Sequence, residues 1–422
     1  MALETVVAAA TRIVTRSTST SRIDTQYFTF STAQCMAKLT QNSSIHVLPP
    51  SYLKALDENG GDPSGWKTPN WTLEECVRFS DTIGASFSVL SVTAPGPAIL
   101  GPTEKGRSLA RALNEEVWTV CQQRPGRFGF FASLPDFNDI EGTISEIKSI
   151  FETEKKANGV VIMTSYGDKL IGDEAFRPIW EELDQHAALV FVHPSHIKIT
   201  PEKIGGFLPQ PVIDYPLATT RAAMSLLVSG IMTECTRIEV ILSHAGGTFP
   251  MLAERALGSL IVPAIAEQSQ GNPIQAYVQA SLNDTNVNQT KMDRKSASKR
   301  FWYDIALSTS EAQLKALLAT APSEQIVYGS DFPYAPKLGI YAGLLQYSRF
   351  SRSAEGSQIG PKKLNQNATI LLRKHSLEGS FLPQAVGKET QISGPEFGLE
   401  DNDDARHARE QLDHSSDCGE GN

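Results

Sequence analysis

Short apolar runs alternate with helical segments along most of this chain, and this alternation constrains the fold more than any other feature. Seven runs are rich in β-branched and aromatic residues and read as strands: 86–93, 128–134, 159–164, 188–193, 238–244, 301–307 and 326–331. Strands that are apolar on both faces are typical of a buried parallel sheet. Because helical patterns separate them, the architecture is either a doubly wound sheet or a closed barrel.

The helical patterns fall between most of the strands, for example at 105–123, 140–157, 174–187, 216–232 and 310–320. An eighth strand would favour the barrel, and its candidates are residues 22–25 and 45–48. The chain has 422 residues, enough for a barrel of about 250 residues with extensions. We therefore predict an α/β fold, a (β/α)8 TIM-type barrel, over residues 22–375.

Three segments depart from this alternation. Residues 1–21 are rich in Ser, Thr, Ala and Arg, and we interpret them as a flexible tail rather than a mitochondrial presequence, since Glu4 and weak amphipathicity oppose the latter. Residues 266–299 are polar and predict a long excursion before the seventh strand. Residues 376–422 contain 11 acidic and 3 basic residues and few large apolar ones, which predicts a disordered acidic tail.

Charge and cysteine content exclude several classes of protein. The net charge is −9 with no basic cluster, which argues against binding to nucleic acid or to an anionic membrane. No apolar run reaches the roughly 18 residues of a membrane span. The five cysteines are scattered, odd in number and without CxxC spacing. That pattern favours a reducing compartment, the cytoplasm, over a disulfide framework.

The eight histidines narrow the search for a site. Four of them lie at or in the tail or inside a predicted helix: His375, His407, His414 and His186. The other four are His46, His193, His196 and His244.

Polar residues follow three of the predicted strands directly and precede Gly or Pro turns: His193, His244 and Asp331. In a barrel this position is the rim where active sites are assembled. A single histidine at a strand end is more often a hydrogen-bonded structural residue, but three independent coincidences favour a shared site. Imidazoles and a carboxylate that converge there suit one divalent ion such as zinc, with an open position for water or substrate. No phosphate-binding GxGxxG follows a strand, so no organic cofactor is expected.

Three strings carry a specific resemblance: FVHP at 191–194, SHAGGTFP at 243–250 and YGSDFP at 328–333. In this order and spacing the chain resembles the amidohydrolase superfamily. It is similar to the branch that contains aminocarboxymuconate semialdehyde decarboxylase and the fungal 6-methylsalicylate-type decarboxylases. The resemblance runs from about residue 45 to about residue 372, and the segments 71–92 and 125–137 share it.

The resemblance implies roles for individual residues. It assigns His193 and Asp331 as metal ligands, together with an N-terminal His-x-His of which only His46 is present. It assigns His244 as a histidine outside the ligand set that orients or protonates the reacting group. Arg255 matches an arginine that reaches the substrate carboxylate, in some members from a neighbouring subunit, which makes a homodimer a candidate assembly. A surface arginine in a salt bridge is the alternative for Arg255. The ion would be zinc, with manganese as the alternative.

The reaction implied is non-oxidative decarboxylation of a small aromatic or muconate-type carboxylic acid. His244, Asp331 or a metal-bound water could protonate the carbon that loses the carboxylate, and the sequence leaves this choice open. Cys76 stands where the semialdehyde decarboxylases carry an arginine, which favours a 6-methylsalicylate-like substrate. One alternative is a metal-dependent hydrolase of a lactone or amide. Another is an inactive barrel that acts as a binding protein.

The first motif of the branch is interrupted. A strand begins at 22–25 (RIDT), but the expected His-x-His is separated from it by residues 26–44, which fit neither a barrel strand nor any motif. We hypothesise that this insert is a translated intron. Gln26 and Tyr27 can be encoded CAG-TAT, which contains a splice donor, and the Ser44 codon can supply the acceptor. Splicing would replace residues 26–44 by one histidine and give RIDTHIHVLPP. The alternative is a genuine insertion in a protein that has lost one ligand.

Overall fold

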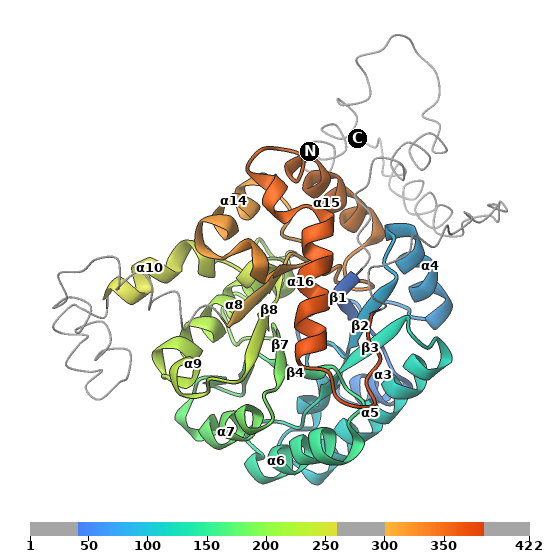
Figure 1. Cartoon of the computed structure of the whole chain (residues 1–422). Helices are drawn as coiled ribbons and strands as arrows, with labels where there is room; N and C mark the ends of the chain where they lie inside the picture. Colours follow the sequence, from blue (N-terminus) through green and yellow to red (C-terminus); the bar gives the residue numbers. More distant parts are fainter. Residues whose placement is uncertain (1–40, 260–299, 384–422) are drawn as a thin grey trace, which may run out of the picture. The chain divides into compact units, whose positions relative to one another are not determined.

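Eight parallel strands form the centre of the molecule (Figure 1). The computed structural model describes residues 41–259 and 300–383. The strands follow one another in chain order around the sheet: β1 (Gln41–His46), β2 (Phe87–Ser91), β3 (Phe128–Ser133), β4 (Gly159–Met163), β7 (Leu189–His193), β8 (Glu239–Leu242), β9 (Phe301–Asp304) and β10 (Ile326–Val327). A short hairpin, β5 (Ser165–Tyr166) and β6 (Lys169–Leu170), extends from β4.

The first and last strands meet through the chain that follows β10. The backbone amide of His46 donates to the carbonyl oxygen of Phe332 at 2.7 Å. Asn42 Nδ2 donates to Ser330 Oγ at 2.8 Å. These bonds bring the two edges of the sheet together. The fold is therefore the predicted (β/α)8 barrel and not the alternative, a doubly wound sheet.

Helices surround the strands on the outside of the barrel (Figure 1). Their bounds are α3 (Pro50–Glu58), α4 (Leu73–Ile83), α5 (Glu104–Gln123), α6 (Ile140–Lys148), α7 (Arg177–Gln185), α8 (Gln210–Val228), α9 (Ile231–Glu234), α10 (Phe249–Ser259), α14 (Glu311–Thr320), α15 (Lys337–Phe350) and α16 (Pro361–Lys374). A π-helical turn, η2 (Ser149–Glu154), prolongs α6. In the described part of the chain, no helix combines the length and the apolar character that crossing a membrane requires.

Local sequence explains where several helices begin. The side chains of Thr72, Thr103 and Asp139 accept backbone N–H bonds in the first turns of α4, α5 and α6. Ser310 and Gln313 form a reciprocal capping box at the start of α14. Such caps satisfy amide groups that have no partner inside the helix.

The eighth strand, β1, overlaps the predicted candidate at 45–48 but begins earlier. It includes residues 41–44, so the expectation that the whole of 26–44 fits no barrel strand is wrong for these four positions. Pairing with β2 uses backbone groups, which any sequence can supply. The register shifts between Asn42 and Ile45, as in a β-bulge. Residues 22–25 and 26–40 lie outside the described residues, as do 266–299.

Some observed strands end earlier than the sequence predicted. His193 is the last residue of β7, but β8 ends at Leu242 and β10 at Val327, so His244 and Asp331 follow their strands rather than end them. Both have left-handed backbone angles, with φ of 54° and 60°. Left-handed backbone is uncommon outside glycine and persists where surrounding structure enforces it.

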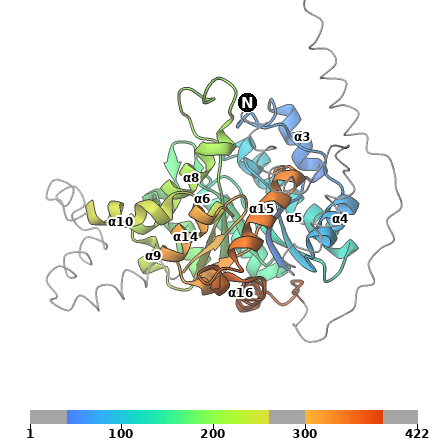
Figure 2. The ribbon, with the colours of Figure 1, turned by 90° about the horizontal axis from the view of Figure 1, so that it is seen from above.

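Helix α16 lies across the amino-terminal ends of the strands, at the opposite end of the barrel from the loop that leads into α8 (Figures 1 and 2). Asn367 donates to the carbonyl of Ile326 at the start of β10. The chain after α16 continues along this end, where the ring of Phe381 stacks on Trp118 at 5.0 Å. Residues 376–383 of the predicted tail therefore pack on the barrel, and 384–422 lie outside the described residues.

Candidate metal centre

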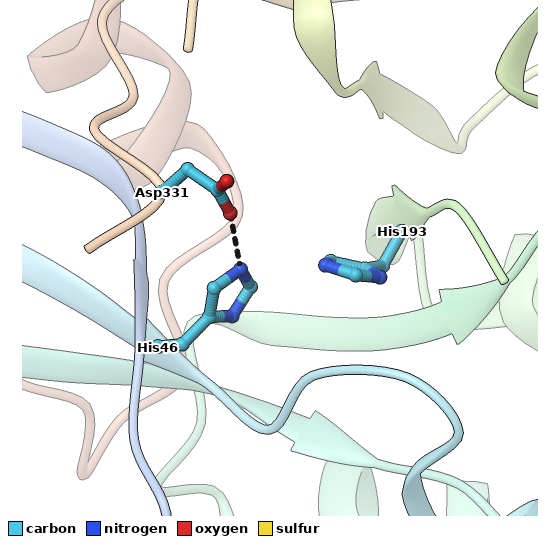
Figure 3. A group of neighbouring side chains, drawn as sticks. All are labelled: His46, His193 and Asp331. Carbon is cyan, nitrogen blue, oxygen red and sulfur yellow. Dashed lines mark hydrogen bonds and ion pairs between the residues drawn. The ribbon is translucent and has the colours of Figure 1, made fainter. Parts of the chain in front are cut away.

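Three side chains meet at the carboxyl-terminal rim of the barrel: His46, His193 and Asp331 (Figure 3). We call them the rim trio. One potential ligand atom from each lies within 4.8 Å of the others. His46 Nε2 lies 3.0 Å from Asp331 Oδ1, and the two imidazole rings meet edge to face at 4.8 Å. The structure thus brings together the three residues that the sequence analysis expected to hold a metal ion.

Backbone carbonyls orient both imidazoles of the rim trio. His46 Nδ1 faces the carbonyl oxygen of Ser91 at 3.3 Å, and His193 Nδ1 faces that of Pro194 at 2.7 Å. Because a carbonyl only accepts, each Nδ1 donates to it, which leaves Nε2 as the nitrogen that a metal can bind. In the structure His46 Nε2 donates to Asp331 Oδ1, and a bound ion would take the place of that proton. Metal-binding histidines are typically held in this way by a bond from the other ring nitrogen. Both Nε2 atoms are therefore suited to bind an ion.

The environment also sets the charges of His193 and Asp331. Burial, reinforced by the neighbouring His46, lowers the pKa of His193 to about 3, so this imidazole is neutral. Burial by itself would raise the pKa of Asp331, but the hydrogen bond from His46 and the nearby histidines outweigh it and lower the pKa. Two imidazoles and an ionised carboxylate form a donor set that fits zinc and other divalent ions with an open coordination position.

His244 lies beside the trio rather than within it. Its Nδ1 donates to the carbonyl oxygen of Ala306 at 3.1 Å. Its charge acts on both Asp331 and His193, since it contributes to the lowered pKa of each. The structure therefore separates His244 from the ligand atoms while keeping it electrostatically coupled to them. The resemblance implied such a division between ligands and a further histidine, and these roles stay a prediction.

The other candidates are not in this group. Arg255 is exposed on α10, and within the described residues no contact joins it to the rim trio. His196 lies near Asp62. Burial raises the pKa of Asp62, and the charge of His196 only partly opposes this rise. Neither residue takes part in the arrangement of His46, His193 and Asp331.

Several residues of the site were missed from the sequence. The ring of Tyr334 meets that of His46 edge to face at 5.7 Å, and the ring of Tyr215 meets that of His193 at 6.5 Å. Asp304, fully buried, accepts the backbone N–H of His244. The strand-end pattern could have found Asp304, because it is the last residue of β9. No pattern singled out the two tyrosines.

A second group of metal-ligating side chains lies away from the rim, on the outer helices: Glu152, Glu182 and His186. Glu182 already has two partners, since it accepts from His186 at 3.0 Å and pairs with Lys148 at 3.7 Å. Glu152 is exposed. These groups satisfy one another on the protein surface, whereas the rim trio is enclosed.

Comparisons with known proteins agree with this geometry. The family model described as Amidohydrolase matches residues 43–373. The chain is 36% identical over 329 residues to the 6-methylsalicylic acid decarboxylase of Penicillium expansum, a match that covers 78% of this chain and 94% of that protein. It is 38% identical over 346 residues to the 6-methylsalicylic acid decarboxylase of Aspergillus aculeatus, which covers 80% of this chain and 98% of that one. A solved dihydroxybenzoic acid decarboxylase of Polaromonas sp. JS666, with bound manganese and an inhibitor, shares the fold. Its TM-score is 0.60 at 18% identity, with 82% of this chain and 99% of that chain covered.

Proposed function

The chain belongs to the amidohydrolase family, and we propose that it is a metal-dependent decarboxylase that releases carbon dioxide from a small aromatic carboxylic acid. The observation that carries this proposal is the buried rim trio with His244 beside it. The two fungal relatives act on 6-methylsalicylic acid, by their names, and this supports a substrate of that type. An aminocarboxymuconate semialdehyde is disfavoured because Cys76 stands where an arginine is expected.

The proposed roles follow from the geometry. His46, His193 and Asp331 would hold one divalent ion, which when bound would orient the substrate carboxylate and stabilise the negative charge of the reaction. The donor set suits zinc, which we favour, and the manganese of the Polaromonas structure supports manganese as the alternative. The edges of Tyr215 and Tyr334 lie against the ligand histidines, where they can contact an aromatic ring.

Proton transfer is assigned to His244 and Asp331. As carbon dioxide leaves, the electron pair of the broken C–C bond stays on the ring carbon and takes up a proton. The bond from His244 Nδ1 to Ala306 fixes this ring, so that Nε2 is the nitrogen able to deliver the proton. Asp331, held ionised, is the second group that could accept a proton and pass it on.

Product analysis tests the proposal. The protein, loaded separately with zinc and with manganese, is incubated with 6-methylsalicylate in deuterated water. We expect carbon dioxide and 3-methylphenol carrying deuterium at the vacated ring position. His244→Ala is expected to keep its metal and lose turnover. Turnover of a lactone or amide with incorporation of solvent oxygen, and no carbon dioxide from the acid, would instead identify a hydrolase.

Arg255 is proposed to bind the substrate carboxylate in the site of a second copy. It is exposed on α10, which packs against α8. Large apolar side chains are exposed in α8, in α10 and in the segment before α8: Ile199, Ile204, Phe207, Val212, Ile213, Leu217, Met251 and Leu252. Exposed large apolar side chains on neighbouring elements are typical of an interface.

Complementation tests this assembly. Arg255→Ala and His244→Ala are each expected to be inactive as homodimers. A mixture of the two is expected to recover activity, because a mixed dimer contains one site with both side chains intact. A monomer by sedimentation, or an Arg255→Ala variant with unchanged KM, contradicts the proposal.

A further inference from the structure

Asp304, the last residue of β9, binds two backbone amides with one oxygen. Its side chain is fully buried. Oδ1 accepts from the amide of Ala306 at 2.8 Å and from that of His244 at 3.3 Å. One carboxyl oxygen therefore joins the chain after β8 to the chain after β9.

These two amides belong to the residues that fix the imidazole of His244. The ring donates from Nδ1 to the carbonyl oxygen of Ala306, so Asp304 holds both the residue that carries the ring and the residue that orients it. The backbone here is left-handed, with φ of 54° at His244 and 55° at Ala245. Non-glycine residues keep such angles only where the surroundings enforce them. The Asp304 carboxyl supplies part of that enforcement.

The second oxygen of Asp304 distinguishes it from a purely structural carboxylate. Oδ2 is buried and has no hydrogen-bond partner within the described residues. Burial raises the pKa of Asp304, while the charge of His244 opposes this rise. A buried carboxyl oxygen without a partner weakens the fold, so stability alone does not account for an aspartate here.

Asp184 provides a matched comparison at the other end of β8. Its Oδ1 also accepts two backbone amides, from Arg237 at 2.6 Å and Ile238 at 3.2 Å. Its Oδ2, however, pairs with the Arg237 guanidinium at 3.6 Å. The two carboxyls share one hydrogen-bonding pattern, but only Asp304 lies beside a residue of the site.

We propose that Asp304 is a positioning residue that holds the imidazole of His244 for proton transfer, through the amides of His244 and Ala306. The inference rests on the proposed function for its kinetic consequence, but its structural part is independent of it. It predicts that the kinetic effect of losing the Asp304 carboxyl disappears when His244 is absent.

Three variants test this: Asp304→Ala, Asp304→Asn and the control Asp184→Ala. We expect Asp304→Ala to lower kcat about 100-fold, the upper end of effects seen for residues that orient a functional group, with KM and metal content little changed. In Asp304→Asn the amide oxygen can still accept both N–H groups, so most of kcat is expected to return. Asp184→Ala is expected to lower the unfolding midpoint and leave kcat of the folded protein unchanged.

A double-mutant cycle with His244→Ala gives the decisive result. In that background Asp304→Ala is expected to cost nothing further, because the imidazole it positions is gone. An equal loss in both backgrounds, or a full kcat in Asp304→Ala, overturns the proposal. Equally low activity of Asp304→Asn and Asp304→Ala also contradicts it, since it would show that the carboxyl acts chemically rather than through the amides.

Histidine side-chain ¹⁵N spectra test the positioning without any turnover. The His244 signal, identified by its absence in His244→Ala, is expected to show an Nδ1-protonated ring in the native chain and a mixture of tautomers in Asp304→Ala. An unchanged tautomer contradicts the inference. A protein that shows the tautomer change but no decarboxylation would retain the positioning role and defeat only the proposed function.

Discussion

The two ends of the barrel each contain a buried histidine paired with a carboxylate, and the two pairs differ in what remains unsatisfied. At the rim, His46 Nε2 lies 3.0 Å from Asp331 Oδ1. At the opposite end, which we call the floor, His375 Nε2 lies 2.7 Å from Glu239 Oε2. Both are histidine–carboxylate pairs, so the main difference lies in their surroundings.

In the floor pair of His375 and Glu239 every partner is used. His375 Nδ1 donates to the carbonyl of Ala187 at 2.7 Å, and its Nε2 donates to Glu239. The other oxygen of Glu239 accepts from Lys374 at 2.7 Å. Such a closed set ties α16 to the strands and has no position open for a ligand.

At the rim the groups are incompletely satisfied. The rim trio gathers its donor atoms in shared space, where His193 Nε2 has only a 3.4 Å contact with Thr93 Oγ1. The Tyr334 hydroxyl and Asp304 Oδ2 are buried without hydrogen-bond partners within the described residues. Asp331 has a left-handed backbone, with φ of 60°. Buried polar groups are normally paired, so these unpaired atoms are positions that a ligand can complete. The comparison indicates that the floor stabilises the barrel and the rim performs its chemistry.

The largest expected effects come from two histidine substitutions, one of which should remove activity and the other stability. His193→Ala removes a ligand and is expected to abolish stoichiometric metal binding and lower kcat about a thousandfold, since a metal contributes several kcal/mol to such a reaction. His375→Ala leaves Glu239 buried without its closest partner and is expected to lower the free energy of unfolding by about 3 kcal/mol, with kcat of the folded protein unchanged. Metal analysis, turnover and urea unfolding measure both. A loss of turnover in folded, metal-loaded His375→Ala would end the distinction between rim and floor.

A smaller effect is expected from pH at the floor. Burial raises the pKa of Glu239, but the bonds from His375 and Lys374 outweigh it and lower the pKa below its ordinary value of 4.5. A carboxyl whose pKa is lower in the folded state adds stability above the unfolded pKa and loses it as pH falls. Glu239→Gln is therefore expected to cost about 2 kcal/mol near neutral pH. This deficit relative to the native chain is expected to shrink as pH falls below about 4.5. Urea unfolding at several pH values measures the deficit, and a constant one would contradict the assigned pairing.

The smallest expected effect concerns the interrupted motif, and it should change metal binding at the rim without changing the floor. Ser44 stands two residues before His46 in β1. Replacing residues 26–44 by a single histidine puts a second imidazole at this position, and residues two apart in a regular strand share a face. We expect metal affinity to rise about tenfold or more, by competition with a chelator, while the acid dependence of stability set at the floor stays the same.

Transcript sequencing decides the origin of the insert. The splicing hypothesis predicts transcripts that lack the codons for 26–44, and it requires CAG followed by T at Gln26. Transcripts that all retain the segment would instead indicate a genuine insertion. If the full chain then bound no metal and the shortened chain did, the natural product would be the inactive barrel considered above.

The strand-end pattern predicted much of the rim because it follows from local constraints. A strand buried on both faces must be apolar along its length, so a polar residue directly after it marks the rim. This located His193, His244 and Asp331 in one place before any contact was known. The same pattern applied to β9 would have added Asp304.

The sequence by itself determined the barrel, its helices and the three strand-end residues, since each depends on periodicity over a few neighbouring residues. Only the tertiary structure decided the partners. His375 looked like the beginning of a tail, yet it is buried against Glu239, 136 positions away. Asp304 reaches the amide of His244 across 60 positions. Which buried polar group finds a partner, and which is left for a ligand, depends on contacts between distant segments that no local pattern encodes.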